Sequence, residues 1–228
     1  MKYLAILAFH LLLLSTSTGQ NTELKLYSEI DSLEIYYDRL TSEFEKPSYN
    51  LFTYGLKGYN KLCAEQKVAN KRYITLIDFT LESNVRRLWV IDLQTLQITH
   101  NSLVSHGRNS GNKRAVKFSN TPNSYMSSLG FYTTSTTYVG KHGYSLYLDG
   151  QEKGINDNAR KRAIVMHSAD YATWNFIKKY DRLGRSYGCP TLPPKKGKVI
   201  INTIKEGSCL FIYYTDKDYI RESLYFNK

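Results

Sequence analysis

The sequence predicts an α+β protein in which a helical segment precedes a larger, mostly β domain. Apolar residues recur every three or four positions over 23–45 and again over about 49–64, which is the period of amphipathic helices. From Tyr73 onward, short runs rich in Val, Ile, Tyr, Phe and Thr lie between polar turns, which is typical of strands.

Most of the remaining elements follow from the same two patterns. Pro47 is expected to end the first helix, and Gly207 to end a later one. Residues 107–126, rich in Ser, Asn, Gly and Lys, indicate a long loop, and 181–194 a second one. Strands are expected at 73–79, 87–93, 97–104, 131–138, 144–148, 163–166 and 209–214, and further helices at 171–180 and 196–205.

The first residues have the three-part pattern of a secretory signal peptide. Lys2 supplies a positive charge, residues 3–14 form an apolar core, and Ser17 and Gly19 are small residues before the expected cleavage point. A retained membrane anchor is the alternative, but spanning a bilayer needs about 20 apolar residues. The expected domain organisation is a signal peptide at 1–19, a helical extension at 20–71 and the main domain at 72–228.

The formal net charge of +11 comes from basic residues that recur along the whole chain. A nucleic-acid-binding protein can have such a charge. However, no repeated aromatic and basic motif accompanies the 20 tyrosines. Export makes an anionic polymer outside the cytoplasm the better partner. We therefore expect no nucleic acid, and no stable membrane insertion once the signal is removed.

The cysteines give the first indication of chemistry. Three are too few for a disulfide framework, and the odd number leaves at least one thiol unpaired. Cys63 and Cys209 have apolar neighbours, as buried structural cysteines do, and whether they pair is left open. Cys189, by contrast, stands between Gly188 and Pro190, which predicts that its thiol is presented on a tight turn.

A nucleophilic cysteine needs a base, because the thiolate attacks and the unperturbed thiol pKa is about 8.5. His167 follows an apolar strand, with one predicted helix between it and Cys189. A histidine that only fills a strand end is the alternative. A zinc site is disfavoured because the chain has no Cys-x-x-Cys pair and no two-histidine helical motif. A papain-like protease is disfavoured because its cysteine precedes its histidine.

Several motifs between about 74 and 214 resemble the YkuD-type L,D-transpeptidases, and most closely the murein L,D-transpeptidase catalytic domain family. The matching segments are 104–111, 118–122, 127–132, 140–143, 156–160 and 184–190. The resemblance implies a YkuD-like mostly-β sandwich or half-barrel and an enzyme of the bacterial periplasm or cell envelope. It also implies acyl transfer on peptidoglycan stem peptides that forms L,D (3-3 type) cross-links through a thioester, with no cofactor and no metal.

The resemblance also implies roles for residues. Cys189 would be the nucleophile, His167 its base and the Ser168 carbonyl the group that orients the imidazole. Backbone N–H groups around Gly188 would stabilise the oxyanion. Arg185 is the cation expected to bind a stem carboxylate. The expected substrate-binding residues are Arg185, Ser186, Tyr187, His106 and His142.

Two further readings stay open at this point. An L,D-carboxypeptidase or a cross-link endopeptidase would use the same residues with water as the acceptor. A non-catalytic wall-binding module would leave Cys189 inert. Because carbapenem-type inhibitors acylate nucleophiles of this family, they are expected ligands of an active Cys189.

Overall fold

The computed structural model describes residues 33–226, so the expected signal peptide lies outside the described residues. The chain forms two compact units, 1–38 and 39–228, and the described part of the first is a helix at 33–38. The helix predicted over 23–45 is therefore wrong from residue 39 onward. Thr41 instead forms a parallel bridge with Gln97, in which its backbone N–H and C=O groups form hydrogen bonds with the edge of the sheet.

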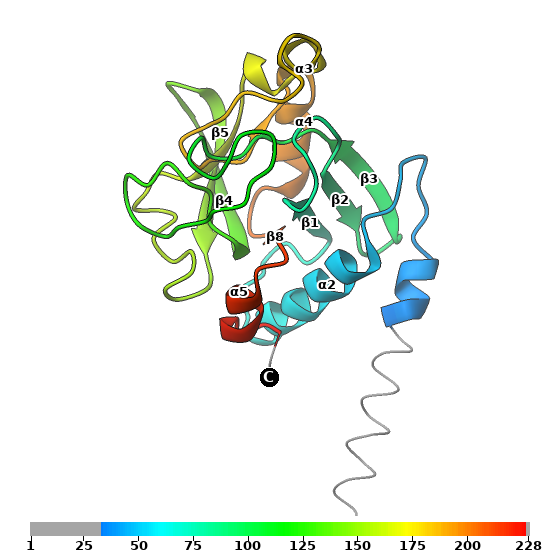
Figure 1. Cartoon of the computed structure of the whole chain (residues 1–228). Helices are drawn as coiled ribbons and strands as arrows, with labels where there is room; N and C mark the ends of the chain where they lie inside the picture. Colours follow the sequence, from blue (N-terminus) through cyan, green and yellow to red (C-terminus); the bar gives the residue numbers. More distant parts are fainter. Residues whose placement is uncertain (1–32, 227–228) are drawn as a thin grey trace, which may run out of the picture. The chain divides into compact units, whose positions relative to one another are not determined.

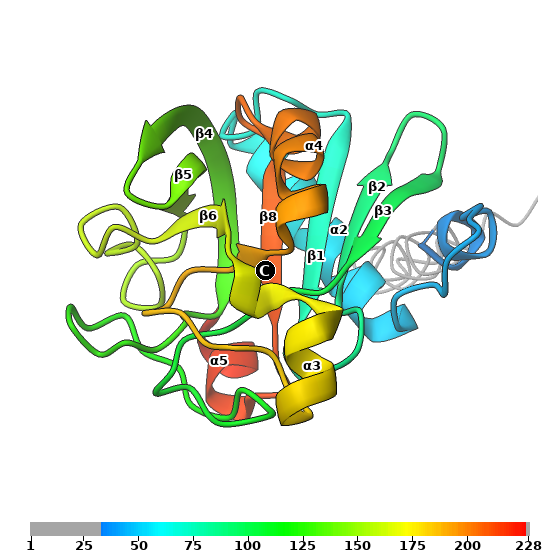
Figure 2. The same ribbon diagram turned by 90° about the horizontal axis from the view of Figure 1, so that it is seen from above.

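The second unit is built on one sheet of eight strands in the order β3-β2-β1-β8-β4-β5-β6-β7. Only the pairs β1–β8 and β6–β7 are parallel. The strands are β1 (Tyr73–Asp78), β2 (Leu88–Asp92), β3 (Gln97–Ser102), β4 (Gly130–Gly140), β5 (Gly143–Gly150), β6 (Val165–Ser168), β7 (Thr191–Leu192) and β8 (Cys209–Tyr213). Figure 2 shows the sheet curling toward closure, so the predicted α+β half-barrel is confirmed.

One helix, α2 (Tyr49–Ala64), packs against β1 and β8 (Figure 1). The Ser48 side chain caps its first turn by accepting a hydrogen bond from the Leu51 backbone N–H at 3.3 Å. Gly58 permits the close approach, because a Cβ there would lie 2.0 Å from the Phe131 ring. The predicted helix at 49–64 is confirmed, and it lies in the same compact unit as the sheet.

A second helix, α4 (Pro194–Ile204), lies on the concave side of the sheet and contacts β1, β5 and β6 (Figure 2). Its start precedes the predicted one by two residues because Pro194 suits the first helical position. Gly207, with φ of +92°, follows its end as predicted. A side chain at Gly197 would collide with the Ser168 hydroxyl, so α4 packs directly behind the strand that carries His167.

The remaining helices are short. The segment predicted as one helix at 171–180 is divided into a 3₁₀ turn, η1 (Asp170–Ala172), and α3 (Trp174–Tyr180). The polar helix α5 (Lys217–Glu222) was not predicted. It is anchored by the buried Glu152 carboxylate, which accepts hydrogen bonds from Tyr219 at 3.0 Å and Ser223 at 2.6 Å. Among residues 33–226, no helix has both the length and the apolar character needed to cross a bilayer.

Candidate active site

The two residues expected to carry the chemistry lie on neighbouring segments of the sheet. β6 and β7 pair in parallel, with His167 opposite Thr191. Cys189 stands two residues before Thr191, and side chains two apart along extended chain share a face. The parallel register therefore places Cys189 beside the start of β6, on the side to which His167 belongs. Strand β7 falls in the stretch predicted as loop, so that prediction is wrong at 191–192.

His167 is only 2% exposed and is held at both ring nitrogens. Its Nδ1 lies 3.1 Å from the Ser168 carbonyl oxygen, and its Nε2 lies 3.2 Å from Thr191 Oγ1. A carbonyl oxygen can only accept, so Nδ1 carries the proton and Nε2 accepts a hydrogen bond from the threonine hydroxyl. The expected contact with Ser168 is present, and it leaves a basic nitrogen at Nε2.

Thr191 is a positioning residue that the sequence analysis missed. Its Oγ1 lies within 3.2 Å of His167 Nε2 and 3.3 Å of the Tyr171 hydroxyl. The Thr191 side chain is completely buried, so these partners fix both the threonine and the imidazole. The sequence did offer a signal for this role, because Thr191 stands two residues after Cys189 and follows a proline that favours extended chain.

The Cys189 thiol is half-buried and faces the start of β6. Its Sγ accepts a hydrogen bond from the Val165 backbone N–H at 3.5 Å and donates to the Ala163 carbonyl at 3.7 Å. Among residues 33–226, no hydrogen bond joins this sulfur to His167. In this arrangement the sulfur is held by the backbone of Val165 and Ala163.

The Cys189 thiol and the His167 imidazole are both neutral in this arrangement. Burial raises the pKa of the Cys189 thiol, although hydrogen bonds from backbone N–H groups and the charges of Arg162 and Lys141 oppose the shift. Burial lowers the pKa of His167, opposed by its bond to the Ser168 carbonyl and assisted by neighbouring His142. Near neutral pH the site thus holds a thiol beside an unprotonated imidazole.

The turn that presents Cys189 depends on a glycine and a serine. Gly188 has φ of +125°, as the predicted tight turn requires, and a Cβ there would lie 2.7 Å from the Met126 carbonyl oxygen. Ser186 is buried, donating to the Cys189 carbonyl at 2.7 Å and accepting from the Gly188 N–H at 3.1 Å. Ser186 therefore closes the turn, and it already occupies the Gly188 N–H that was expected to serve the oxyanion.

Long loops support this turn from behind. The Ser127 hydroxyl joins the turn to the start of the 107–126 loop, because it donates to the Gly188 carbonyl at 3.1 Å and accepts from the Gly107 N–H at 3.0 Å. Arg162 donates to the Met126 carbonyl at 2.5 Å and to other acceptors of the same loop. The sequence analysis missed Arg162, although the motif segment 156–160 ends just before it.

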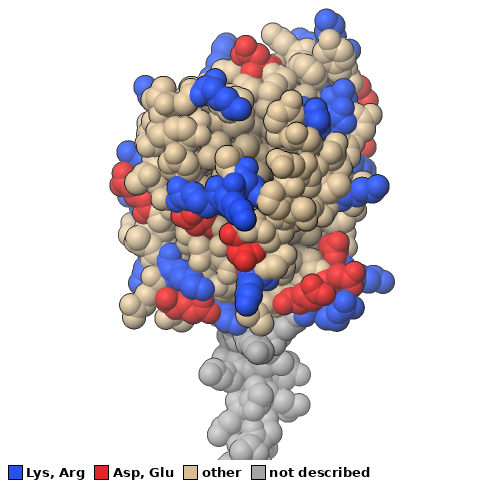
Figure 3. Space-filling model, turned by 90° about the vertical axis from the view of Figure 1, so that its left-hand side faces the viewer, with Lys and Arg blue, Asp and Glu red and all other residues tan. Residues whose placement is uncertain are grey.

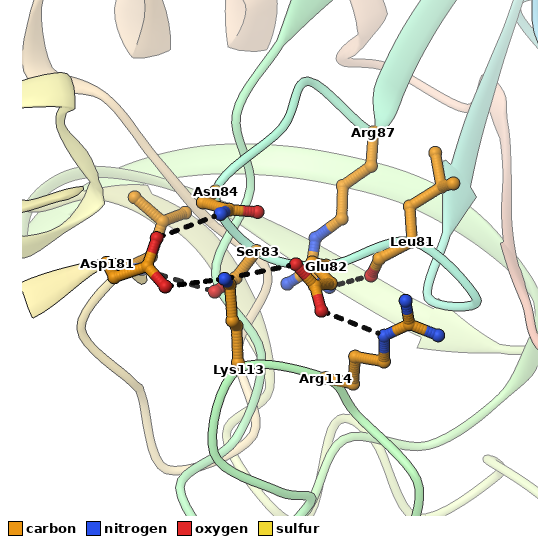
Figure 4. Close-up of polar contacts among 9 residues, drawn as sticks. Leu81, Glu82, Ser83, Asn84, Arg87, Lys113, Arg114 and Asp181 are labelled. Carbon is orange, nitrogen blue, oxygen red and sulfur yellow. Dashed lines mark hydrogen bonds and ion pairs between the residues drawn. The ribbon is translucent and has the colours of Figure 1, made fainter.

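A polar network ties three segments of the chain together (Figure 4). Lys113 lies 2.6 Å from Asp181 and 3.2 Å from Glu82, while Arg114 contacts the second oxygen of Glu82 at 3.2 Å. Asn84 donates to Asp181 at 3.3 Å. These groups are solvated, so each ion pair contributes little stability. Together they tether the β1–β2 loop, the 107–126 loop and the end of α3.

Two of the expected substrate-binding residues have their polar atoms engaged within the fold. His106 is 1% exposed, with Nδ1 2.8 Å from Arg87 Nη2, and burial assisted by the Arg87 charge lowers its pKa to about 3. Arg185 donates through Nη1 to the carbonyls of Arg108 at 3.3 Å and Gly111 at 3.1 Å. Both side chains thereby stabilise the loop around 107–111.

Of the other three, Ser186 is buried in the turn described above, whereas His142 and Tyr187 lie at the surface. The His142 ring, on the β4–β5 turn, stacks on the His167 ring with centroids 4.5 Å apart and an interplanar angle of 22°. Tyr187 is 61% exposed, two residues before Cys189. The fold thus brings His142 against His167 from 25 residues away in the sequence, whereas Tyr187 lies near Cys189 because the two are close in the chain.

The charged surface is mixed on the face drawn in Figure 3, where Lys and Arg lie among Asp, Glu and uncharged residues. That face carries no continuous basic track of the kind that follows a nucleic-acid backbone. Within the part of the chain that the structure describes, no group of three or more His, Cys, Asp or Glu side chains is placed to hold a metal ion.

Comparison with known proteins gives one family match. The model of the L,D-transpeptidase catalytic domain matches residues 43–213, most of the chain and all of the strands. The search of the curated proteins found no match.

Solved structures similar to this chain include several L,D-transpeptidases. One from Mycobacterium smegmatis is 12% identical, covers 63% of this chain and 59% of its own, and has a TM-score of 0.39. L,D-transpeptidase 3 from Mycobacterium tuberculosis is 13% identical over 63% of this chain and 61% of its own, with a TM-score of 0.40. One from Stackebrandtia nassauensis is 14% identical over 82% and 78%, with a TM-score of 0.39. The chain thus spans about three fifths of the length of the first two.

Proposed function

Because the chain belongs to the L,D-transpeptidase catalytic domain family, we propose that it is a cysteine acyl transferase that forms L,D cross-links between peptidoglycan stem peptides. The observation that carries the proposal is the β6–β7 register, which puts the Cys189 thiol and the basic His167 Nε2 on one face of the sheet. A thiol and a neutral histidine that a third group holds in place are the parts that thiol acyl transfer requires.

In the first half-reaction the Thr191 hydroxyl turns away from His167 Nε2, and the Cys189 thiol turns from Val165 toward His167 and transfers its proton to Nε2. The sulfur attacks the carbonyl between the third and fourth residues of the donor stem, and a C–S bond forms. The C–N bond then breaks, and the terminal D-amino acid leaves with the proton that His167 returns. The Cys189 N–H is the oxyanion donor of the turn, since Ser186 occupies the Gly188 N–H.

In the second half-reaction an amine of another stem attacks the thioester. Neutral His167 accepts the amine proton, a new amide forms, and the sulfur leaves and is reprotonated. The acceptor distinguishes the proposed transferase from an L,D-carboxypeptidase or endopeptidase, in which water takes the place of the amine. The chemistry on Cys189 and His167 is otherwise the same.

The remaining parts of the chain fit an exported enzyme. We propose that residues 1–19 direct secretion to the periplasm or cell envelope. The polymer outside the cytoplasm that presents stem peptides is then within reach of the enzyme. Cleavage near residue 20 is checked by determining the amino terminus of the protein secreted from a bacterial host.

The function is tested by incubation with purified disaccharide-tetrapeptide followed by mass analysis. Cross-linked dimer is the expected product, tripeptide alone indicates the water-using alternative, and no change contradicts catalysis on this donor. Cys189→Ser should yield neither product, because a serine hydroxyl is far harder to ionise than a thiol. Cys63→Ser serves as the matched control, since it alters a thiol outside the site.

A carbapenem provides a second and independent test, because its strained lactam acylates an activated nucleophile. Wild type should gain the inhibitor mass in intact-protein mass spectrometry, and Cys189→Ser should not. An adduct of equal yield on Cys189→Ser would place the nucleophile elsewhere. An inert wild-type thiol would favour a non-catalytic wall-binding module.

A further inference from the structure

An arginine and two tyrosines form a cluster directly beside the nucleophile turn, here called the Arg108 cluster. The Arg108 guanidinium carbon lies 4.3 Å from the ring centroid of Tyr125 and 4.7 Å from that of Tyr187. The two rings themselves are 4.7 Å apart. Tyr187 stands two residues before Cys189, so the cluster adjoins the reacting sulfur along the same short turn.

The backbone holds the Arg108 cluster against the turn. The Arg108 N–H donates to the Ser186 carbonyl at 2.8 Å, and Gly107 pairs with Ser186 in a parallel bridge. The Asn109 N–H donates to the Tyr125 carbonyl at 3.1 Å. Tyr125 has φ of +54°, a conformation that bulky residues rarely adopt unless their surroundings impose it.

The three arginines around the turn differ in what their side chains already bind. Arg185 donates to the carbonyls of Arg108 and Gly111, and Arg162 donates to loop acceptors that include the Met126 carbonyl. The Arg108 guanidinium has no hydrogen bond and no ion pair among residues 33–226, although it is stacked on two rings. Its planar set of donors is therefore free and held in a defined orientation.

We infer that Arg108 is the residue that binds a carboxylate of the donor stem, a role that the sequence analysis gave to Arg185. A guanidinium presents two parallel N–H groups that match the two oxygens of a carboxylate. Stacking on Tyr125 and Tyr187 leaves those edge N–H groups open and reduces the side-chain entropy lost on binding. The inference rests on the proposed function, because it names the group that positions the stem for Cys189.

A tetrapeptide stem carries carboxylates at its end and along its length, and all share the chemistry that Arg108 would recognise. The test therefore uses three synthetic stems: the free acid, the C-terminal amide, and a stem amidated at its internal carboxyls. Binding is measured by calorimetry on proteins carrying Cys189→Ala, so that no turnover occurs. The variants are Arg108→Gln, Arg108→Lys and, as a matched arginine on α5, Arg221→Gln.

Arg108→Gln should weaken binding of the free-acid stem by about 10- to 100-fold, which is the range for losing a charge-assisted hydrogen-bonded pair. One of the two amidated stems should bind with the same low affinity whether residue 108 is Arg or Gln. The group that is amidated in that stem is then the carboxylate that Arg108 binds. Arg108→Lys should restore part of the affinity, because it keeps the charge but not the planar fork. Arg221→Gln should bind like wild type.

A purely structural role for Arg108 predicts a different result. If Arg108→Gln lowered the affinity for the acid and amide stems alike, the inference would be overturned. It would also be overturned if Arg108→Gln still bound the acid stem more tightly than the amide stems. Cross-linking activity of the wild type on the free-acid stem is measured in parallel. A wild type that cross-links while Arg108→Gln still discriminates refutes only the inference. A wild type that neither binds nor processes any stem refutes both the inference and the proposed function.

Discussion

Replacing Gly188 by alanine tests the architecture of the nucleophile turn directly. The backbone there has φ of +125°, and left-handed conformations cost an L-residue about 1–2 kcal/mol. In addition, the new Cβ would lie 2.7 Å from the Met126 carbonyl oxygen and 2.8 Å from Ile164 Cδ1, and overpacking of this kind costs about 1–3 kcal/mol. The total loss of unfolding free energy should be roughly 2–5 kcal/mol.

Gly154 offers a matched control, because its φ is +80° and a Cβ there would meet nothing within 4 Å. Gly154→Ala should therefore lose only the conformational part, about 1–2 kcal/mol. Urea unfolding of both variants and of wild type, monitored by circular dichroism, gives the two differences. If Gly188→Ala were no less stable than Gly154→Ala, the close packing of Gly188 on the 107–126 loop would be refuted.

Three further predictions concern titratable groups. Cys209→Ala should cost about 1–3 kcal/mol of stability, because Cys209 is fully buried, yet spare turnover per folded molecule; lost turnover in a folded variant would contradict this. The pKa of His106 falls to about 3 in the fold, so between about pH 6.5 and 3 only the unfolded chain binds a proton there. The free energy of unfolding should therefore drop by about 1.4 kcal/mol per pH unit as the pH falls through this range. Urea titrations at several pH values should show a flatter slope for His106→Gln. Alkylation of Cys189 by iodoacetamide should keep accelerating above the free-thiol pKa of about 8.5, since burial raises the pKa; a plateau at neutral pH would oppose this.

The sequence identified those parts of the site whose signals are local. Gly188 and Pro190 on either side of Cys189 exclude a regular strand or helix, so a turn could be predicted without knowing its neighbours. The seven longer strands of the sheet were found because their composition differs from that of the turns. The Ser168 contact was expected from the family resemblance, and it joins two residues that are adjacent in the chain.

The parts that were missed depend on partners distant in sequence. β7 is two residues long and is a strand only because β6 lies beside it. The helix predicted to 45 ends early because Thr41 pairs with Gln97. Arg108 stood in the motif segment 104–111, but nothing local showed that Arg185 donates to backbone carbonyls while Arg108 does not. Choosing between two arginines requires knowledge of which donors the fold has already used.

The order of strands also bears on how the chain reaches its native state. β8, from the last tenth of the described chain, lies between β1 and β4 in the middle of the sheet and pairs in parallel with β1. Neither half of the sheet can join the other until Cys209–Tyr213 has been synthesised. Such distant pairing slows folding, because a long loop must close before its contacts form. A chain built in this way stays open until its end is available, and a truncation before β8 removes the centre of the sheet and not its edge.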